Sequence, residues 1–140
     1  MPKALILATR KPNISPSTFR TRYEAHVELL KRISTSDFPL SHRRSYIART
    51  TSTSNSPPEN NDTLPRNAST PAAVIVGQQA DIDFDAIAEL TFADDAALQA
   101  FMAKVSAPEA AKLIADDEEG FSDRERLRIV MVGDVVETTN

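Results

Sequence analysis

The chain contains two histidines, and both stand in patterns that predict a place inside a folded domain. His26 belongs to a stripe of residues at spacings of three and four, the pattern of the buried face of an amphipathic helix. The other members of this stripe are Phe19, Tyr23, Leu30 and Ile33. Imidazole exchanges protons near neutral pH, so a histidine on such a face is a candidate general acid or base. The alternative is a core histidine with a purely structural hydrogen bond.

The second histidine opens an alternating run, residues 42–47, which is typical of a strand. Alternation puts His42, Arg44 and Tyr46 on one face of that strand. We therefore expect His26 and His42 to be the catalytic pair, with His42 as a proton-transfer partner or an oxyanion stabiliser. Tyr23 and Tyr46 are candidate substrate-binding residues, and Tyr46 would hold a phenolate or carbonyl oxygen if it is not a core or interface residue. Arg44 is expected to bind substrate or to form an ion pair.

Five further segments are predicted around these residues. A short apolar strand over 3–9 ends at turn residues, and Ser15 with Pro16 then begins the helix that carries His26. The strand with His42 is predicted over 40–50 and a third strand over 84–92. A helix capped by Asp94 or Asp95 breaks at Pro108 and continues as a second helical piece. The last strand is predicted over 126–136.

Alternation and spacing also predict which side chains point inward. The third strand places one set of apolar residues toward the core: Phe84, Ala86, Ala88, Leu90 and Phe92. The helix after it has its own inward set: Leu98, Phe101, Met102 and Val105. The acidic run 116–119 is expected to be a solvated helix end.

Residues 51–72 form a low-complexity insertion rich in Ser, Thr, Asn and Pro. Aromatic residues are absent from it, which favours a disordered or mobile loop over the alternative of a structured active-site lid.

The order of predicted elements is β-α-β-β-α-β, which defines an α+β, ferredoxin-like fold for a single domain spanning 1–140. Two helices on one face of a four-stranded antiparallel sheet leave the other face bare. Because that face carries apolar residues, we expect it to pack against a second copy as a dimeric α+β barrel. The chain is therefore predicted to be a homodimer.

Composition excludes several classes of function. The net charge of −4 and the absence of a basic patch argue against nucleic acid or a membrane surface as partner. The absence of cysteine removes disulfides, thiolate catalysis and thiolate metal sites. Three glycines provide no phosphate-binding loop, and no metal or cofactor site is predicted. The apolar run 4–8 is too short for a signal peptide or a membrane span, so a cytoplasmic location is expected.

Four stretches of the chain resemble the EthD-like proteins of the dimeric α+β barrel superfamily. They are residues 11–26, the strand 42–47, the segment 84–92 with its Asp-x-Ile-Ala-Glu-Leu-x-Phe pattern, and the segment 116–123. The insertion after residue 50 departs from the family pattern. Asp123 occupies the Phe-x-Asp position of the family, which implies that it orients a histidine; a turn cap is the alternative.

The resemblance implies an activity without a bound cofactor. Similar fungal proteins accompany aromatic-polyketide pathways, where they decarboxylate, dehydrate or cyclise an intermediate. This implies a lyase or cyclase that acts on an aromatic polyketide-like small molecule, with His26 and His42 as general acid and base. Two other readings remain: a cofactor-free monooxygenase acting on a phenolic substrate, and a non-catalytic accessory protein that binds a hydrophobic intermediate.

Overall fold

The structure is a computed structural model of the 140-residue chain, and it describes residues 1–50 and 67–140. Its strands and helices follow one another in the order predicted from the sequence, with the second helical region divided in two. The strands are β1 (Lys3–Ala8), β2 (Ser41–Tyr46), β3 (Ala86–Thr91) and β4 (Arg128–Val132). The helices are α1 (Pro16–Ser34), α2 (Asp95–Ser106) and α3 (Pro108–Glu118), with short 3-10 turns over Thr35–Asp37 and Gln79–Asp81.

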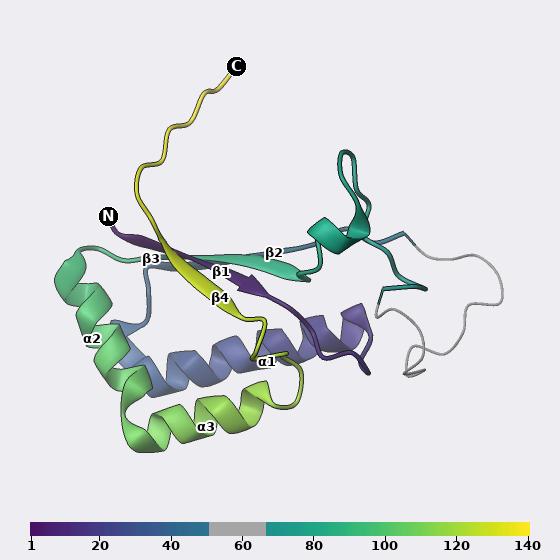
Figure 1. The fold of residues 1–140 in the computed structure, drawn as a ribbon. Coiled ribbons are helices and arrows are strands. Elements are labelled where there is room, and N and C mark those ends of the chain that lie inside the picture. Colours follow the sequence, from purple (N-terminus) through teal and green to yellow (C-terminus); the bar gives the residue numbers. More distant parts are fainter. Residues whose placement is uncertain (51–66) are drawn as a thin grey trace.

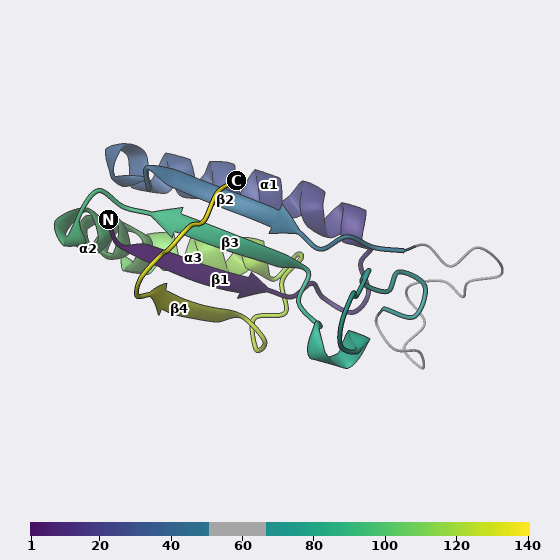
Figure 2. The ribbon, with the colours of Figure 1, turned by 90° about the horizontal axis from the view of Figure 1, so that it is seen from above.

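The four strands form one antiparallel sheet in the order β2-β3-β1-β4. All three helices cover the same face of this sheet (Figure 1), and the view from above shows the strands side by side over them (Figure 2). This is the ferredoxin-like α+β arrangement, so the predicted fold class is confirmed.

Local sequence signals explain where α1 begins. The Ser15 side chain accepts a hydrogen bond from the backbone N–H of Thr18 at 3.1 Å, and Pro16 occupies the first turn. Phe19, Tyr23 and His26 are buried along the predicted stripe, as is Val27. The helix thus presents an aromatic and imidazole face to the sheet.

The core lies between the sheet and the helices in two clusters. One joins the aromatic residues of α1 to Ala86 and Ala88 of β3. The other joins Leu90 and Phe92 to Phe101 of α2. The predicted alternation of the third strand is confirmed for its buried members, because Ile87 and Glu89 lie on the opposite face.

Several predicted boundaries were too long. The last strand pairs only over β4, and the second strand ends at Tyr46, with an isolated bridge between Arg49 and Ala72 beyond it. Met102 was predicted to point inward, but it is 48% exposed, whereas the neighbouring Phe101 is buried.

Residues 51–66 of the insertion predicted over 51–72 lie outside the described residues. Its remaining part, residues 67–72, contacts the rest of the domain. Asn67 is buried and accepts a hydrogen bond from Arg10, and Ala72 is bridged to Arg49. Residues 67 and 72 of the predicted insertion are therefore held by contacts with the rest of the domain.

The face of the sheet turned away from the helices carries apolar side chains. Register pairs Leu5 with Val130, and Leu7 lies opposite Ile87. Leu5, Leu7 and Ile87 are half-buried, and Val130 is 58% exposed. Within the part of the chain that the structure describes, no helix covers this face (Figure 1).

Among the described residues, none of the helices combines the length and the apolar character that crossing a membrane requires.

Candidate active site

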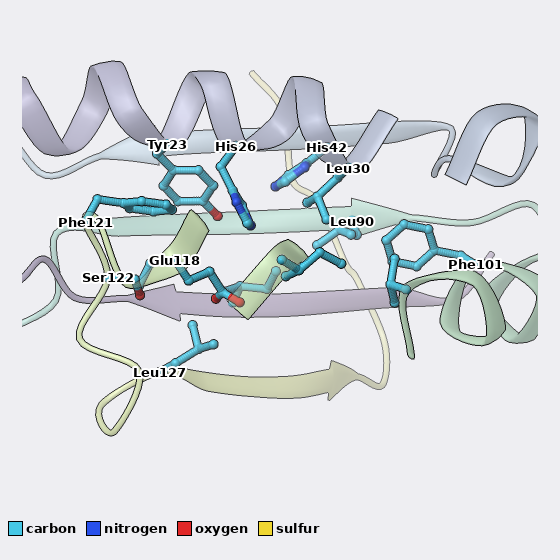
Figure 3. Close-up of a pocket in the computed structure, with 14 residues that line it drawn as sticks. Tyr23, His26, Leu30, His42, Leu90, Phe101, Glu118, Phe121, Ser122 and Leu127 are labelled. Carbon is cyan, nitrogen blue, oxygen red and sulfur yellow. The ribbon is translucent and has the colours of Figure 1, made fainter. Parts of the chain in front are cut away.

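A cavity of about 210 Å³, partly open to solvent, lies between the helices and the sheet. Figure 3 shows the histidines and Tyr23 on one side of it and apolar side chains around them. The polar members of the wall are few: Tyr23, His26, His42, Glu118 and Ser122. The apolar members are Ile6, Ala8, Leu30, Leu90, Phe101, Val105, Ile114, Phe121 and Leu127. Sites of this kind bind mostly apolar small molecules and orient them with a small number of polar groups.

His26 reaches the cavity from the buried face of α1 and is held by a carboxylate. Its Nδ1 lies 2.7 Å from Oδ2 of Asp117 at the end of α3, and its ring packs 5.2 Å from that of Phe121. Because a carboxylate accepts hydrogen bonds, this contact favours a proton on Nδ1 and leaves Nε2 with its lone pair. A histidine oriented in this way can act as a base through Nε2.

His42 reaches the same cavity from β2. Both ring nitrogens are buried, and neither has a hydrogen-bond partner among the described residues. Burial, assisted by the positive charge of Arg44, lowers the pKa of His42 to about 4. The imidazole is therefore neutral near pH 7 and has one N–H donor and one acceptor nitrogen to offer a bound molecule.

Tyr23 lies near both histidines on the wall of the cavity. Its ring is 6.5 Å from that of His26 and 6.2 Å from that of His42. Burial raises the pKa of Tyr23 to about 12, so the phenol keeps its proton and can serve as a hydrogen-bond donor. The structure thus brings together three of the predicted site residues: His26, His42 and Tyr23.

Arg44 and Tyr46 share the inner face of β2 with His42, but they do not line the cavity. Arg44 donates two hydrogen bonds to the carboxylate of Glu24, at 2.6 and 2.8 Å, and Tyr46 donates one at 2.5 Å. These contacts lower the pKa of Glu24 to about 2. The three side chains form an ion-pair cluster between α1 and β2, so Arg44 acts on the cavity only through its charge.

Asp123 is not brought to either histidine. Its side chain lies 3.5 Å from Arg126, and its backbone N–H bonds to the carbonyl of Thr9. The carboxylate that orients a histidine is that of Asp117. Asp117 belongs to the acidic run that was predicted to be a solvated helix end, and its side chain is 45% exposed while it bonds to His26.

Glu118 is the second member of that run with a place in the site. Its side chain lines the cavity, and burial raises its pKa. The signal was present in the sequence, because Glu118 follows Ile114 by four residues on the inward face of α3.

Sequence reasoning also missed a buried charged cluster at the end of the sheet. The Arg10 side chain is fully buried and pairs with Asp85 at 2.6 Å, and Arg49 pairs with the same carboxylate. Arg10 also donates to Asn67 at 2.8 Å. This cluster lies outside the cavity. It connects Asn67 to the chain segments just after β1 and just before β3.

Nowhere in residues 1–50 and 67–140 do three or more His, Asp or Glu side chains gather in a way that could hold a metal ion. The arrangement instead suits proton transfer: one carboxylate-oriented imidazole, one neutral imidazole, one phenol and one carboxyl group around an apolar space.

The fold and the cavity together define a small α+β protein of the ferredoxin-like class with a site between helices and sheet. The EthD domain family matches residues 11–125, and the chain belongs to that family. No match to the chain was found among curated proteins.

Two solved structures share the fold. One is the protein At3g17210 from Arabidopsis thaliana, 15% identical, with a TM-score of 0.52 over 99% of this chain and 100% of that one. The other is an ethyl tert-butyl ether D (EthD) family protein from Bacillus halodurans, 14% identical, with a TM-score of 0.50 over 96% of this chain and 100% of that one. At these identities the likeness concerns the fold alone.

Proposed function

We propose that this EthD-family protein is a cofactor-independent lyase or cyclase that acts on an aromatic polyketide-like small molecule. The observation that carries the proposal is that two imidazoles line one largely apolar cavity. Asp117 orients the ring of His26. Neither ring nitrogen of His42 has a hydrogen-bond partner among the described residues. Unpaired buried polar atoms are costly, so a cavity that keeps them is suited to a ligand that pairs with them.

The two histidines would divide the chemistry. Nε2 of His26, with Nδ1–H held by Asp117, removes a proton from the carbon beside a carbonyl group. The neutral N–H of His42 donates a hydrogen bond to the carbonyl oxygen, where negative charge develops. A neutral imidazole suits this role because its weakly acidic N–H stabilises an enolate without transferring the proton. Tyr23 would donate a further hydrogen bond to the same molecule.

The size of the cavity limits the substrate. A cavity of about 150 Å³ holds a benzene molecule, and this cavity measures about 210 Å³. We therefore propose a substrate with a single aromatic ring and a short keto side chain.

A turnover assay with single-ring aromatic β-keto acids and β-diketones tests the proposal. Product mass and CO2 release are followed with and without oxygen for the wild type, His26→Ala and His42→Ala. Glu28→Ala is the control, since Glu28 is exposed on the same helix two residues from His26. We expect oxygen-independent turnover that falls at least 100-fold in either histidine variant and is unchanged in the control.

Other outcomes would favour the alternatives. Turnover that requires oxygen and consumes it would identify a monooxygenase of phenolic substrates. Tight binding without turnover would identify an accessory protein, which the largely apolar cavity wall would also suit. Equal activity of wild type and both histidine variants would refute a catalytic role for the imidazoles.

We also propose that a second copy of the chain covers the apolar outer face of the sheet. The support is the group of apolar side chains on this face, which no helix covers within the described residues: Leu5, Leu7, Ile87 and Val130. Sedimentation of the wild type should give a dimer and Val130→Asp a monomer. The control is Leu113→Asp, which changes a similarly exposed residue on α3. A wild-type monomer would contradict this proposal.

A further inference from the structure

Glu118 differs from every other acid in the run at the end of α3. Asp116 pairs with Lys112, Asp117 bonds to His26, and Glu119 pairs with Lys11. Glu118 is the member of this run whose carboxyl group has no hydrogen bond or ion pair with the described residues, and its side chain lines the cavity. A carboxyl group with no protein partner on a mostly apolar wall is available to a bound molecule.

The Glu118 carboxyl group lies on a different part of the cavity wall from His42, whose N–H is proposed to bond to the carbonyl oxygen of the substrate. Figure 3 shows Glu118 toward β1, whereas His42 enters from β2. A molecule that bonds to His42 through one oxygen would therefore present a different substituent to Glu118. The site then has hydrogen-bonding groups for two separate oxygens of one small ligand.

The surroundings of Glu118 raise its pKa on balance. Burial has the largest effect and raises the pKa, and the neighbouring carboxylates of Asp117 and Glu119 act in the same direction. Arg124 after α3 lowers it by its positive charge, and so does His26 on α1 when its ring carries the proton taken from a substrate. Tyr23 and His42, the other titratable groups on the wall, are neutral near pH 7. A raised pKa increases the fraction of carboxyl that can donate a proton near neutral pH.

We propose that Glu118 is a catalytic general acid that protonates a departing hydroxyl group, so that the site dehydrates single-ring aromatic β-hydroxyketones. This inference rests on the proposed function, because it needs the enolate that His26 and His42 form. In the step, the carbon–hydroxyl bond breaks as the enolate closes a carbon–carbon double bond. The hydroxyl takes the Glu118 proton and leaves as water. The proton held by His26 then returns through water to the Glu118 carboxylate, and the product is a conjugated enone.

The probe for this inference is 4-hydroxy-4-phenylbutan-2-one, which has one ring, a ketone and a β-hydroxyl group. Two rates are measured on it: exchange of the proton at carbon 3 with D2O by NMR, and formation of the enone by ultraviolet absorbance. Exchange reports the base and oxyanion groups alone, whereas enone formation also needs the acid. The variants are Glu118→Gln, Glu118→Asp and, as control, Glu119→Gln in the exposed neighbour.

We expect Glu118→Gln to keep proton exchange within about threefold of wild type and to lose enone formation by about 100-fold or more. Glu118→Asp should recover part of the loss, and Glu119→Gln should behave as wild type. Wild-type enone formation should fall as pH rises through the raised pKa of Glu118, and Glu118→Gln should lack this decrease.

Three results would overturn the inference. The first is unchanged enone formation in Glu118→Gln. The second is equal loss of both rates in that variant, which would make Glu118 a structural residue. The third is wild-type exchange without enone formation, which leaves the proposed function standing. Absence of wild-type exchange would refute the proposed function itself, and the inference would fall with it.

Discussion

The neutral state of His42 makes a prediction about protein stability. Burial and Arg44 lower its pKa from 6.5 to about 4 in the folded protein, while the unfolded chain keeps the ordinary value. Between these two pH values the unfolded chain binds more protons than the folded protein. Relative to acid pH, the free energy of unfolding is therefore higher by the full His42 contribution above pH 6.5. This contribution is lost as the pH falls toward 4. Replacing His42 with Leu, which is apolar and does not titrate, should remove this dependence.

The size of the effect follows from the two pKa values. Each pKa unit corresponds to about 1.4 kcal/mol, so a shift from 6.5 to about 4 is worth about 3 kcal/mol once both states are protonated. At pH 4.5 the loss relative to pH 7.5 is about 2.5 kcal/mol. Glu118 acts in the opposite direction, since its raised pKa makes the folded protein bind more protons in this range. This contribution is common to wild type and His42→Leu, so it cancels in their difference.

Urea unfolding at several pH values between 4.5 and 7.5 measures this difference. We expect the wild type to lose about 2.5 kcal/mol more than His42→Leu across the range. Glu24 titrates at about pH 2 in the folded protein, and its contribution is the same in both proteins. Parallel pH dependences in the two proteins would refute the argument that His42 is neutral because it is buried on the cavity wall.

Three further predictions concern residues in and around the site. Asp85→Asn should lower the free energy of unfolding by about 3 kcal/mol, because it leaves the fully buried Arg10 without its carboxylate. Calorimetry should then show a melting temperature lower by about 10 °C, and an unchanged value would contradict the burial of this pair. Asp117→Asn should reduce turnover tenfold or more with an unchanged circular dichroism spectrum. The reason is that the amide N–H of Asn can donate to Nδ1 of His26, which places the ring proton on Nε2. Full turnover in this variant would show that Asp117 does not orient His26. Tyr46→Phe should keep turnover within about twofold of wild type, as Tyr46 bonds to Glu24 outside the cavity, and a large loss in kinetic assays would place Tyr46 in the site after all.

Periodicity was enough to predict the fold and half of the site. Spacings of three and four placed His26 on the buried face of α1, and alternation placed His42 on the inner face of β2. Both patterns report directly which side of an element meets the core. The order of elements then gave the sheet topology, because only a few arrangements of these elements are favourable.

The rest of the site depends on distances along an element, which periodicity does not encode. Tyr46 shares a strand face with His42, yet it lies further along β2, where Glu24 of α1 meets it. The acidic run at the end of α3 was assigned to solvent as a whole, because its charge hid the inward position of Glu118. Arg10 is buried beside Asp85 and Asn67, which are remote in sequence, so no local pattern marks its burial.

The central claim is that His26 and His42 serve one ligand in one cavity. NMR of protein labelled with 15N in the histidine rings tests it directly during titration with acetophenone, a single-ring ketone. The account predicts that the ring nitrogen signals of both histidines shift together and give one dissociation constant. Signals that do not move at saturating acetophenone, or that move for one histidine alone, would contradict it.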